Sequence, residues 1–158
     1  MEYLNLYDND GILLKEKGIR GQKNDHKVGI VLLFIENSKG EFLIQKTSPE
    51  RESIYATTGG HVTYGSTFEE TVINEAKEEL GIDITIDEVT EVNTYIREKV
   101  IQKVYYLKKD INIEDITTQE DEVEFVKWLS KEEIDNLIKN KEFRESNIPG
   151  YKYIIEGK

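Results

Sequence analysis

The feature of the sequence that most restricts its fold is an almost uninterrupted apolar run at residues 28–35, Val-Gly-Ile-Val-Leu-Leu-Phe-Ile. A strand with one solvated face alternates apolar and polar side chains, whereas this run offers no polar face. It therefore predicts a strand that is buried on both faces. Such a strand lies within a sheet that other layers of structure cover on each side.

Segments with strand or helix patterns surround this run. We expect further strands at residues 3–7, 12–14, 41–47, 54–58, 89–96, 100–107 and 123–129. We expect helices at residues 67–80 and 131–139, the second opened by the capping-box spacing of Ser130 and Glu133. Residues 143–155 are ambiguous, because Pro149-Gly150 is expected to interrupt any helix there. Together these segments predict a mixed sheet with two or three helices, an α/β or α+β fold in a single domain spanning residues 1–158.

Charge and cysteine content exclude several classes of function. The chain has no cysteine, which excludes disulfides, thiolate metal sites and cysteine nucleophiles. Its formal net charge of −11 repels a nucleic-acid backbone unless a basic patch is segregated. Acidic residues dilute the densest basic stretch, which contains Lys15, Lys17, Arg20, Lys23 and Lys27. We therefore expect no nucleic-acid partner.

The N-terminal residues lack the pattern of a targeting signal. Residues 1–5 show neither the basic start nor the apolar run of a signal peptide. No apolar stretch approaches the length needed to span a bilayer. We expect a cytoplasmic protein with no membrane partner.

Residues 59–80 contain the side chains best suited to chemistry. A glycine-containing loop is expected at residues 59–65, directly before the helix at residues 67–80. Glu75, Glu78 and Glu79 lie at i, i+3 and i+4 on that helix, so they share a face. Carboxylates this close repel each other unless a cation lies between them, and hard oxygen ligands suit Mg²⁺ or Mn²⁺. The alternative is a solvated glutamate face, which is common on helices.

The same segment resembles the Nudix box, the signature motif of the Nudix hydrolase family. The motif reads Gly, five residues, Glu, seven residues, Arg-Glu, an apolar residue, any residue, Glu-Glu, any residue, Gly and an apolar residue. Counted from Gly60, the matching positions are Gly60, Glu75, Ala76, Glu78, Glu79, Gly81 and Ile82. The order of the surrounding strands is also similar to the family, so the resemblance covers most of the chain, although only the box is a specific motif.

The resemblance implies an α/β/α sandwich with a mixed sheet and a divalent-metal-dependent hydrolase that cleaves a diphosphate linkage. By position, Glu78 and Glu79 are expected as the principal metal ligands, and Glu75 as a ligand or as the base that activates water. Either Glu75 or Glu79 is a candidate catalytic base. The Gly59 carbonyl is a further candidate ligand, and Glu122 resembles a late acidic residue that some members add to the site. An equal alternative is that Glu122 is a solvated glutamate in the acidic loop at residues 119–122.

Two positions depart from the box, with Ser66 where the family has its first glutamate and Asn74 where it has arginine. Ser66 has another explanation, because Glu69 follows three residues later and the pair could cap the helix. The two departures could compensate each other or mark a weak or inactive member. A ligand-binding module with this fold is therefore the alternative function, and a plain interaction protein that binds no metal is a third.

The chain opening at residues 3–11, Tyr-Leu-Asn-Leu-Tyr-Asp-Asn-Asp-Gly, resembles that of the Nudix branch related to isopentenyl-diphosphate isomerase. His26 and His61 stand near positions where those isomerases place metal-binding histidines. The isomerases also use a catalytic cysteine, and Gly59 stands at about that place here. Isomerase chemistry by that mechanism is therefore not expected. His61 remains a candidate substrate or metal contact, whereas His26 is expected at the surface.

The substrate contacts are harder to predict than the metal ligands. Lys46, Arg51 and Tyr55 lie between the expected return strand and the box, where they could bind a phosphate or a base. Each of them alone could equally be a solvated loop residue. The expected ligand is a small diphosphate compound whose identity the box does not specify, and a homodimer is possible because family members often form one.

Overall fold

The structure, a computed structural model, describes residues 1–118 and 121–157. Its strands are β1 (Tyr3–Tyr7), β2 (Leu13–Ile19), β3 (Lys27–Glu36), β4 (Phe42–Thr47), β5 (Tyr55–Ala56), β6 (Thr58–His61), β7 (Thr90–Ile96), β8 (Val100–Lys108) and β9 (Val123–Leu129). Its α-helices are α1 (Phe68–Leu80), α2 (Lys131–Lys139) and α3 (Ile148–Glu156). In this part of the chain, no helix has the length and apolar character needed to cross a membrane. Residues 119 and 120 of the acidic loop lie outside the described residues.

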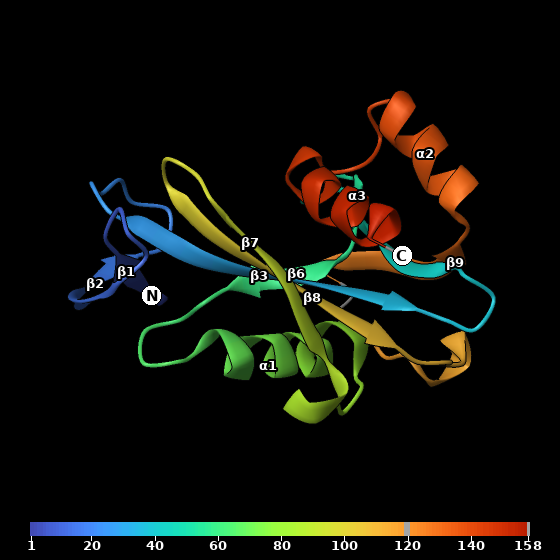
Figure 1. Cartoon of the computed structure of the whole chain (residues 1–158), viewed down its shortest axis with the longest axis horizontal. Helices are drawn as coiled ribbons and strands as arrows, with labels where there is room; N and C mark the ends of the chain where they lie inside the picture. The colour runs from blue at the N-terminus through green and yellow to red at the C-terminus, as the bar shows by residue number, and fades with distance from the viewer. Residues whose placement is uncertain (119–120, 158) are drawn as a thin grey trace.

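The strands form one mixed sheet centred on β3. This strand pairs in parallel with β8 from Val28↔Val100 to Glu36↔Lys108, and antiparallel with β1, β4 and β6. β4 continues the sheet through β5 and β9, both antiparallel to it. Helix α1 covers one side of the sheet, and α2 and α3 cover the other (Figure 1). The predicted α/β/α sandwich is therefore confirmed.

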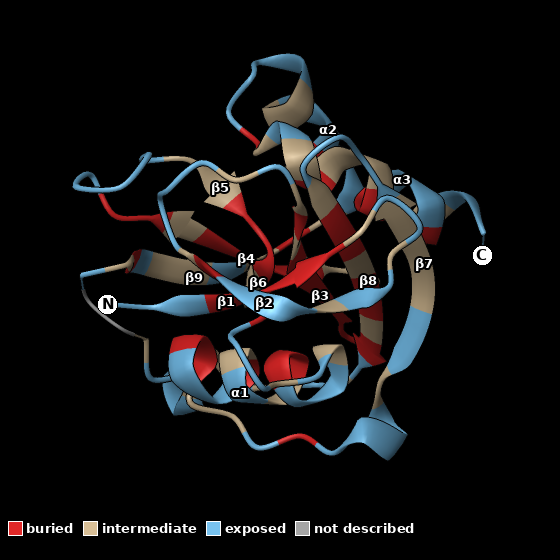
Figure 2. Ribbon diagram, turned by 90° about the vertical axis from the view of Figure 1, so that its left-hand side faces the viewer, coloured by how far each residue is buried: buried red, intermediate tan, exposed pale blue. Residues whose placement is uncertain are grey.

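The core consists of two apolar clusters separated by β3. Val31, Leu33 and Ile35 join the cluster that contains the buried side chains of α1. Leu32 and Phe34 alternate with them and join the cluster that contains the buried side chains of α2 and α3. Figure 2 shows the buried residues concentrated in the strands between the helical layers. The prediction that residues 28–35 form a strand buried on both faces is confirmed.

Helix α1 begins with a capping box, but one residue later than the sequence indicated. Thr67 is the N-cap, because its side chain accepts a hydrogen bond from the Glu70 backbone N–H while the Glu70 carboxylate accepts one from the Thr67 N–H. The prediction that Ser66 caps the helix with Glu69 is therefore wrong. The helix ends at Gly81, which adopts the left-handed conformation with φ of 69°. Apolar residues spaced four apart along the helix face the core, where three of them are fully buried: Val72, Ala76 and Leu80.

Two strand predictions need correction. The segment expected as a loop from Gly59 onward begins instead with β6, in which Gly60 pairs with Val31 and Gly59 with Leu32. Strand β2 is longer than expected, because its middle is charged and exposed and pairs with β1 at the edge of the sheet. An edge strand of this kind buries few side chains, so its hydrophobic pattern is weak.

The expected interruption at Pro149-Gly150 is also wrong. Both residues lie in the first turn of α3, where proline loses no helical hydrogen bond. Gly150 packs against β8, because a Cβ there would lie 3.0 Å from a Val104 methyl carbon. Proline therefore starts this helix, and glycine lets it approach the sheet closely.

Candidate functional site

A cavity of about 630 Å³ opens between α1, β6 and the loops that precede β5, β9 and α3. Its lining is rich in charge of both signs. The charged lining residues are Glu2, Arg20, Arg51, Glu52, Glu75, Glu78, Glu79, Glu122 and Arg144. All five of the predicted metal ligands line this one cavity, since Gly59 belongs to the lining as well.

Glu79 is the most buried of these carboxylates, with 8% of its surface exposed. Its Oε1 accepts a hydrogen bond of 3.1 Å from the Gly59 N–H, and the Gln45 side chain also hydrogen-bonds to it. Burial nevertheless raises the pKa of Glu79 from 4.5 to about 7, because these two hydrogen bonds only partly offset the loss of hydration. Glu79 is thus a fixed carboxylate whose negative charge lacks full compensation.

Glu75 lies one turn earlier on α1 and directly against β6. A Cβ added at Gly60 would lie 2.4 Å from the Glu75 carboxyl carbon, so only glycine leaves room for this carboxylate. Burial raises the pKa of Glu75 to about 8, and the charges of Glu79 and Glu78 raise it further in the same direction. The glycine of the box therefore gives Glu75 its place beside the strand.

Gly59 is required for a different reason. A Cβ there would lie 2.4 Å from the Val31 carbonyl oxygen, which is backbone and cannot move aside. Its N–H points to Glu79 rather than to β3. Because the N–H and C=O of one strand residue point to the same side, the Gly59 carbonyl is turned toward the same edge as Glu79.

Glu122 and Arg51 reach the cavity from loops distant in sequence. The Arg51 Nη2 and Glu122 Oε1 atoms form an ion pair of 2.8 Å. Glu122 is half-buried and lines the cavity, so the structure places it beside the predicted site rather than in free solvent. Glu78 is exposed on α1 and lines the same cavity.

The structure places Lys46 and Tyr55 away from the cavity. The Lys46 ammonium lies 4.9 Å from the centre of the Tyr55 ring, and neither residue belongs to the lining. Side chains alternate along a strand, so Gln45 and Thr47, which flank Lys46, face the cavity instead. Of Lys46, Arg51 and Tyr55, only Arg51 lies at the cavity.

His61 has free ring nitrogens in the cavity wall. Within residues 1–118 and 121–157, neither nitrogen has a hydrogen-bond partner. Burial and then the Arg20 guanidinium lower the pKa of His61, so the imidazole is neutral at pH 7. A neutral imidazole offers a ligand one donor and one acceptor. His26, by contrast, is half-buried just before β3 and lies 3.5 Å from the Glu16 carboxylate.

The two positions that depart from the box also line the cavity. The Ser66 hydroxyl lies 3.1 Å from that of Thr63. Asn74 is exposed, and its side chain forms no hydrogen bond within the described part of the chain. Asn74 therefore orients none of the glutamates, and Gly59, Gly60 and Gln45 hold those carboxylates instead.

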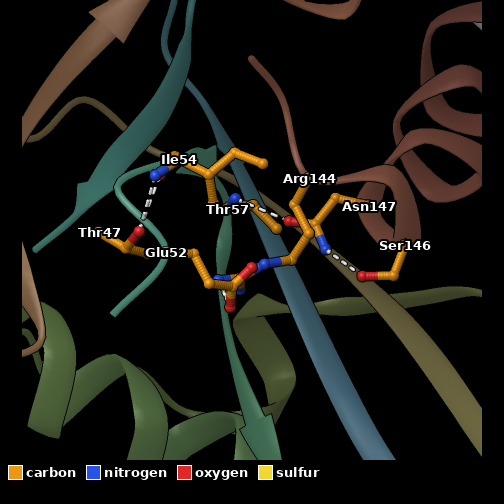
Figure 3. A network of polar contacts seen from close by, with 7 residues as sticks. All are labelled: Thr47, Glu52, Ile54, Thr57, Arg144, Ser146 and Asn147. Carbon is orange, nitrogen blue, oxygen red and sulfur yellow. Dashed lines mark hydrogen bonds and ion pairs between the residues drawn. The ribbon is translucent and has the colours of Figure 1, made fainter. Parts of the chain in front are cut away.

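Sequence reasoning missed the wall that precedes α3. Arg144 Nη2 forms an ion pair of 2.8 Å with Glu52 Oε1. The buried Asn147 side chain accepts a 3.0 Å hydrogen bond from the Thr57 N–H and donates to the Ser146 hydroxyl (Figure 3). The polar run at residues 144–147 was a signal, but only the fold brings it against residues 52–57. This wall adds a guanidinium and a rigid amide to the site.

The donor set suits a hard divalent cation, although it is not fully assembled. Across the described ranges, no three Asp, Glu or His side chains already converge to hold one metal ion. Glu75 and Glu79 have raised pKa values because their charges are buried together, and a bound cation would relieve that penalty. Rotation of exposed Glu78 and release of Glu122 from Arg51 would complete an oxygen-rich site beside the Gly59 carbonyl.

Known proteins share this sequence and fold. The NUDIX domain family model matches residues 25–151. A Nudix hydrolase of Listeria innocua is 30% identical over 151 residues, which cover 90% of this chain and 88% of that protein. The asymmetrical bis(5'-nucleosyl)-tetraphosphatase of Mus musculus is 33% identical over 129 residues, 76% of this chain and 84% of that one. The crystal structure of DR0079 from Deinococcus radiodurans has a TM-score of 0.76 at 23% identity, covering 89% of this chain and 91% of its own. The chain belongs to the Nudix hydrolase family.

Proposed function

We propose that the protein is a divalent-metal-dependent hydrolase that cleaves a diphosphate linkage in a nucleoside diphosphate derivative. The observation that carries this proposal is a pair of carboxylates, buried Glu79 and half-buried Glu75, held against the adjacent glycines of β6. Two carboxylates so close together and so far removed from water are costly to ionise unless a cation binds between them. The family membership supports hydrolysis as the reaction.

The metal is Mg²⁺ or Mn²⁺ in this proposal, because its ligands are all oxygen atoms. Glu75, Glu78, Glu79 and Glu122 would supply carboxylates, and Gly59 its backbone carbonyl. When bound, such a cation neutralises the diphosphate charge and lowers the pKa of coordinated water. The absence of cysteine from the sequence agrees with an oxygen-only site.

The protein side chains divide the remaining work. Glu75 or Glu79 accepts the proton of the attacking water, since raised pKa values place both carboxylates close to the neutral range that suits a general base. Arg51 and Arg144 line the opposite wall, where their guanidinium groups can bind phosphate oxygens once they leave Glu122 and Glu52. His61 contacts the substrate from the end of β6.

The proposal that the substrate is a nucleotide derivative depends on the similarity to related proteins. The mouse relative is named as a bis(5'-nucleosyl)-tetraphosphatase, which supports a nucleoside phosphate compound as the class of ligand. The finer likeness of the chain opening to isopentenyl-diphosphate isomerase-like proteins stays a prediction. A cysteine nucleophile of that kind is excluded by composition. A homodimer also stays a prediction.

Asn74 supports the alternative of a ligand-binding module without turnover. The family arginine is replaced by a side chain that forms no hydrogen bond within the described residues, so the usual means of orienting a catalytic glutamate is missing. Under this alternative, the cavity binds metal and nucleotide, but the phosphorus–oxygen bond is not cleaved.

Phosphate or pyrophosphate release from a panel of nucleoside di- and triphosphates, sugar nucleotides and dinucleotides would separate the two functions. Each assay would contain Mg²⁺, Mn²⁺ or a chelator, with the wild type beside Glu79→Gln. Glu69→Gln is the matched control, because Glu69 is an exposed glutamate of the same helix outside the cavity. The proposal expects metal-dependent turnover that Glu79→Gln loses and Glu69→Gln keeps. Nucleotide binding with no turnover of any compound would favour the binding module.

A further inference from the structure

A second cavity of about 730 Å³ adjoins the cavity that contains Glu75 and Glu79, which is called the acidic cavity below, and has a different electrostatic character. It lies between the loop that follows β2, the start of β3 and the turn that joins β7 to β8. In Figure 1 these segments lie at the end of the molecule opposite α2. Buried or half-buried apolar residues form its floor, and polar residues form its rim. The floor residues are Leu4, Ile19, Val28 and Val100.

The rim is cationic. Arg20, Lys23 and Lys99 line the cavity, together with Asp25 as the single acidic residue. The arginines of the acidic cavity each pair with a glutamate, including Arg20 with Glu2 at 3.2 Å. Lys23 and Lys99, by contrast, form no ion pair with any described residue. Two unpaired ammonium groups in one hollow are unexpected in a chain of net charge −11.

Lys99 is held in place by the backbone rather than by a carboxylate. The Lys99 ammonium donates to the Asn24 carbonyl at 3.1 Å, which ties the β7–β8 turn to the loop that carries Lys23. Buried Lys27 donates to the carbonyls of Arg97 and Glu98 and so anchors the same turn. The cavity is therefore a built feature of the fold, and its positive charges remain available to a ligand.

The two cavities adjoin at Arg20 and His61, which line both of them. Gly60, next to His61, contacts Glu75 in the acidic cavity. A molecule whose scissile diphosphate lies over Glu75 can therefore extend past His61 into the cationic cavity. Most of the residues that line the cationic cavity precede residue 25, where the match to the NUDIX domain begins.

We propose that the cationic cavity binds a further phosphate group of the substrate, beyond the linkage that is cleaved. This inference rests on the proposed function, and it names the substrate class. The preferred substrates carry phosphate on both sides of the scissile linkage. A sugar nucleotide, whose charge ends at the diphosphate, leaves the cationic rim without a partner.

Calorimetric titration with inorganic tripolyphosphate, in chelator and without divalent metal, tests the cavity itself. Under these conditions no cation joins the probe to the glutamates of the acidic cavity, and Arg51 and Arg144 are paired with carboxylates there, so the cationic cavity is expected to bind the probe more tightly. The double variant Lys23→Gln/Lys99→Gln should bind at least about tenfold more weakly than the wild type, because two charge contacts are lost. The double variant Lys139→Gln/Lys152→Gln removes the same charge from exposed positions outside both cavities and should bind like the wild type.

Steady-state kinetics test whether the bound phosphate belongs to the substrate. For a dinucleoside tetraphosphate, Lys23→Gln/Lys99→Gln should raise KM by about tenfold relative to the lysine control pair, with kcat retained, because uniform binding is lost. An unchanged KM with weakened tripolyphosphate binding would show a site for free anions and overturn the substrate assignment. No tripolyphosphate binding by the wild type, or equal binding by all three proteins, would overturn the proposal that the cationic cavity binds phosphate. Absence of any turnover would refute the proposed function alone, since calorimetry needs no catalysis.

Discussion

Substitution of Gly60 by alanine should separate activity from stability. The new Cβ would lie 2.4 Å from the Glu75 carboxyl carbon, whereas ordinary contact begins at 3.4 Å, so the carboxylate must move by about 1 Å. A misplacement of that size in a catalytic group costs about 100-fold in rate. The carboxylate is the end of a flexible side chain, and Gly60 does not have positive φ, so the fold should tolerate the change. We expect unfolding free energy to change by less than about 1 kcal/mol.

The assay compares kcat/KM on the best panel substrate with unfolding in urea. Gly59→Ala is the matched control, because its Cβ would meet the Val31 carbonyl oxygen at 2.4 Å. That clash is with backbone, so we expect Gly59→Ala to lower unfolding free energy by about 1–3 kcal/mol. If Gly60→Ala keeps activity within threefold while Glu75→Gln abolishes it, the close contact between Gly60 and Glu75 does not position the catalytic group.

Three further outcomes follow from the same contacts. Without metal, unfolding free energy should fall as pH rises from about 5 to 9. The cause is that Glu75 and Glu79 have folded pKa values of about 8 and about 7, above the unfolded 4.5, so both carboxylates ionise within the folded protein. Urea titrations at several pH values should show that unfolding free energy depends less steeply on pH in Glu79→Gln than in the wild type. Metal affinity should rise over the same range with release of protons, which calorimetry in buffers of different ionisation enthalpy measures. Asn147→Ala should lower unfolding free energy by about 1–3 kcal/mol, since it strands the buried Thr57 N–H, and thermal unfolding reports the loss.

The parts of the fold that sequence could predict are those set by local periodicity. The apolar run at residues 28–35 required two covered faces, and the structure shows an apolar cluster on each side of it. The spacing of Glu75, Glu78 and Glu79 placed their carboxylates on one helix face by geometry alone. Only the beginning of strand β2 was predicted, because its exposed edge position leaves little hydrophobic pattern in the rest of the strand.

The parts of the site that could not be predicted depend on long-range packing. Arg144 and Asn147 reach the cavity only because residues before α3 pack against residues 52–57. Gln45 rather than Lys46 faces the cavity because successive side chains of β4 point to opposite faces of the sheet. A register shift of one residue would reverse these orientations. The cationic cavity needs Lys99 from the β7–β8 turn, so the diluted basic stretch near Lys23 did not reveal it.

The most direct test of the central claim measures Mn²⁺ binding and turnover together. Electron paramagnetic resonance gives the affinity for Mn²⁺, and substrate hydrolysis over the same Mn²⁺ concentrations gives the dependence of activity on the metal. In the wild type the two half-saturation points should coincide, and Glu79→Gln should weaken binding and turnover while Glu69→Gln changes neither. Turnover that persists in chelator, or Mn²⁺ binding that Glu79→Gln leaves intact, would contradict the assignment of these buried carboxylates to a metal site.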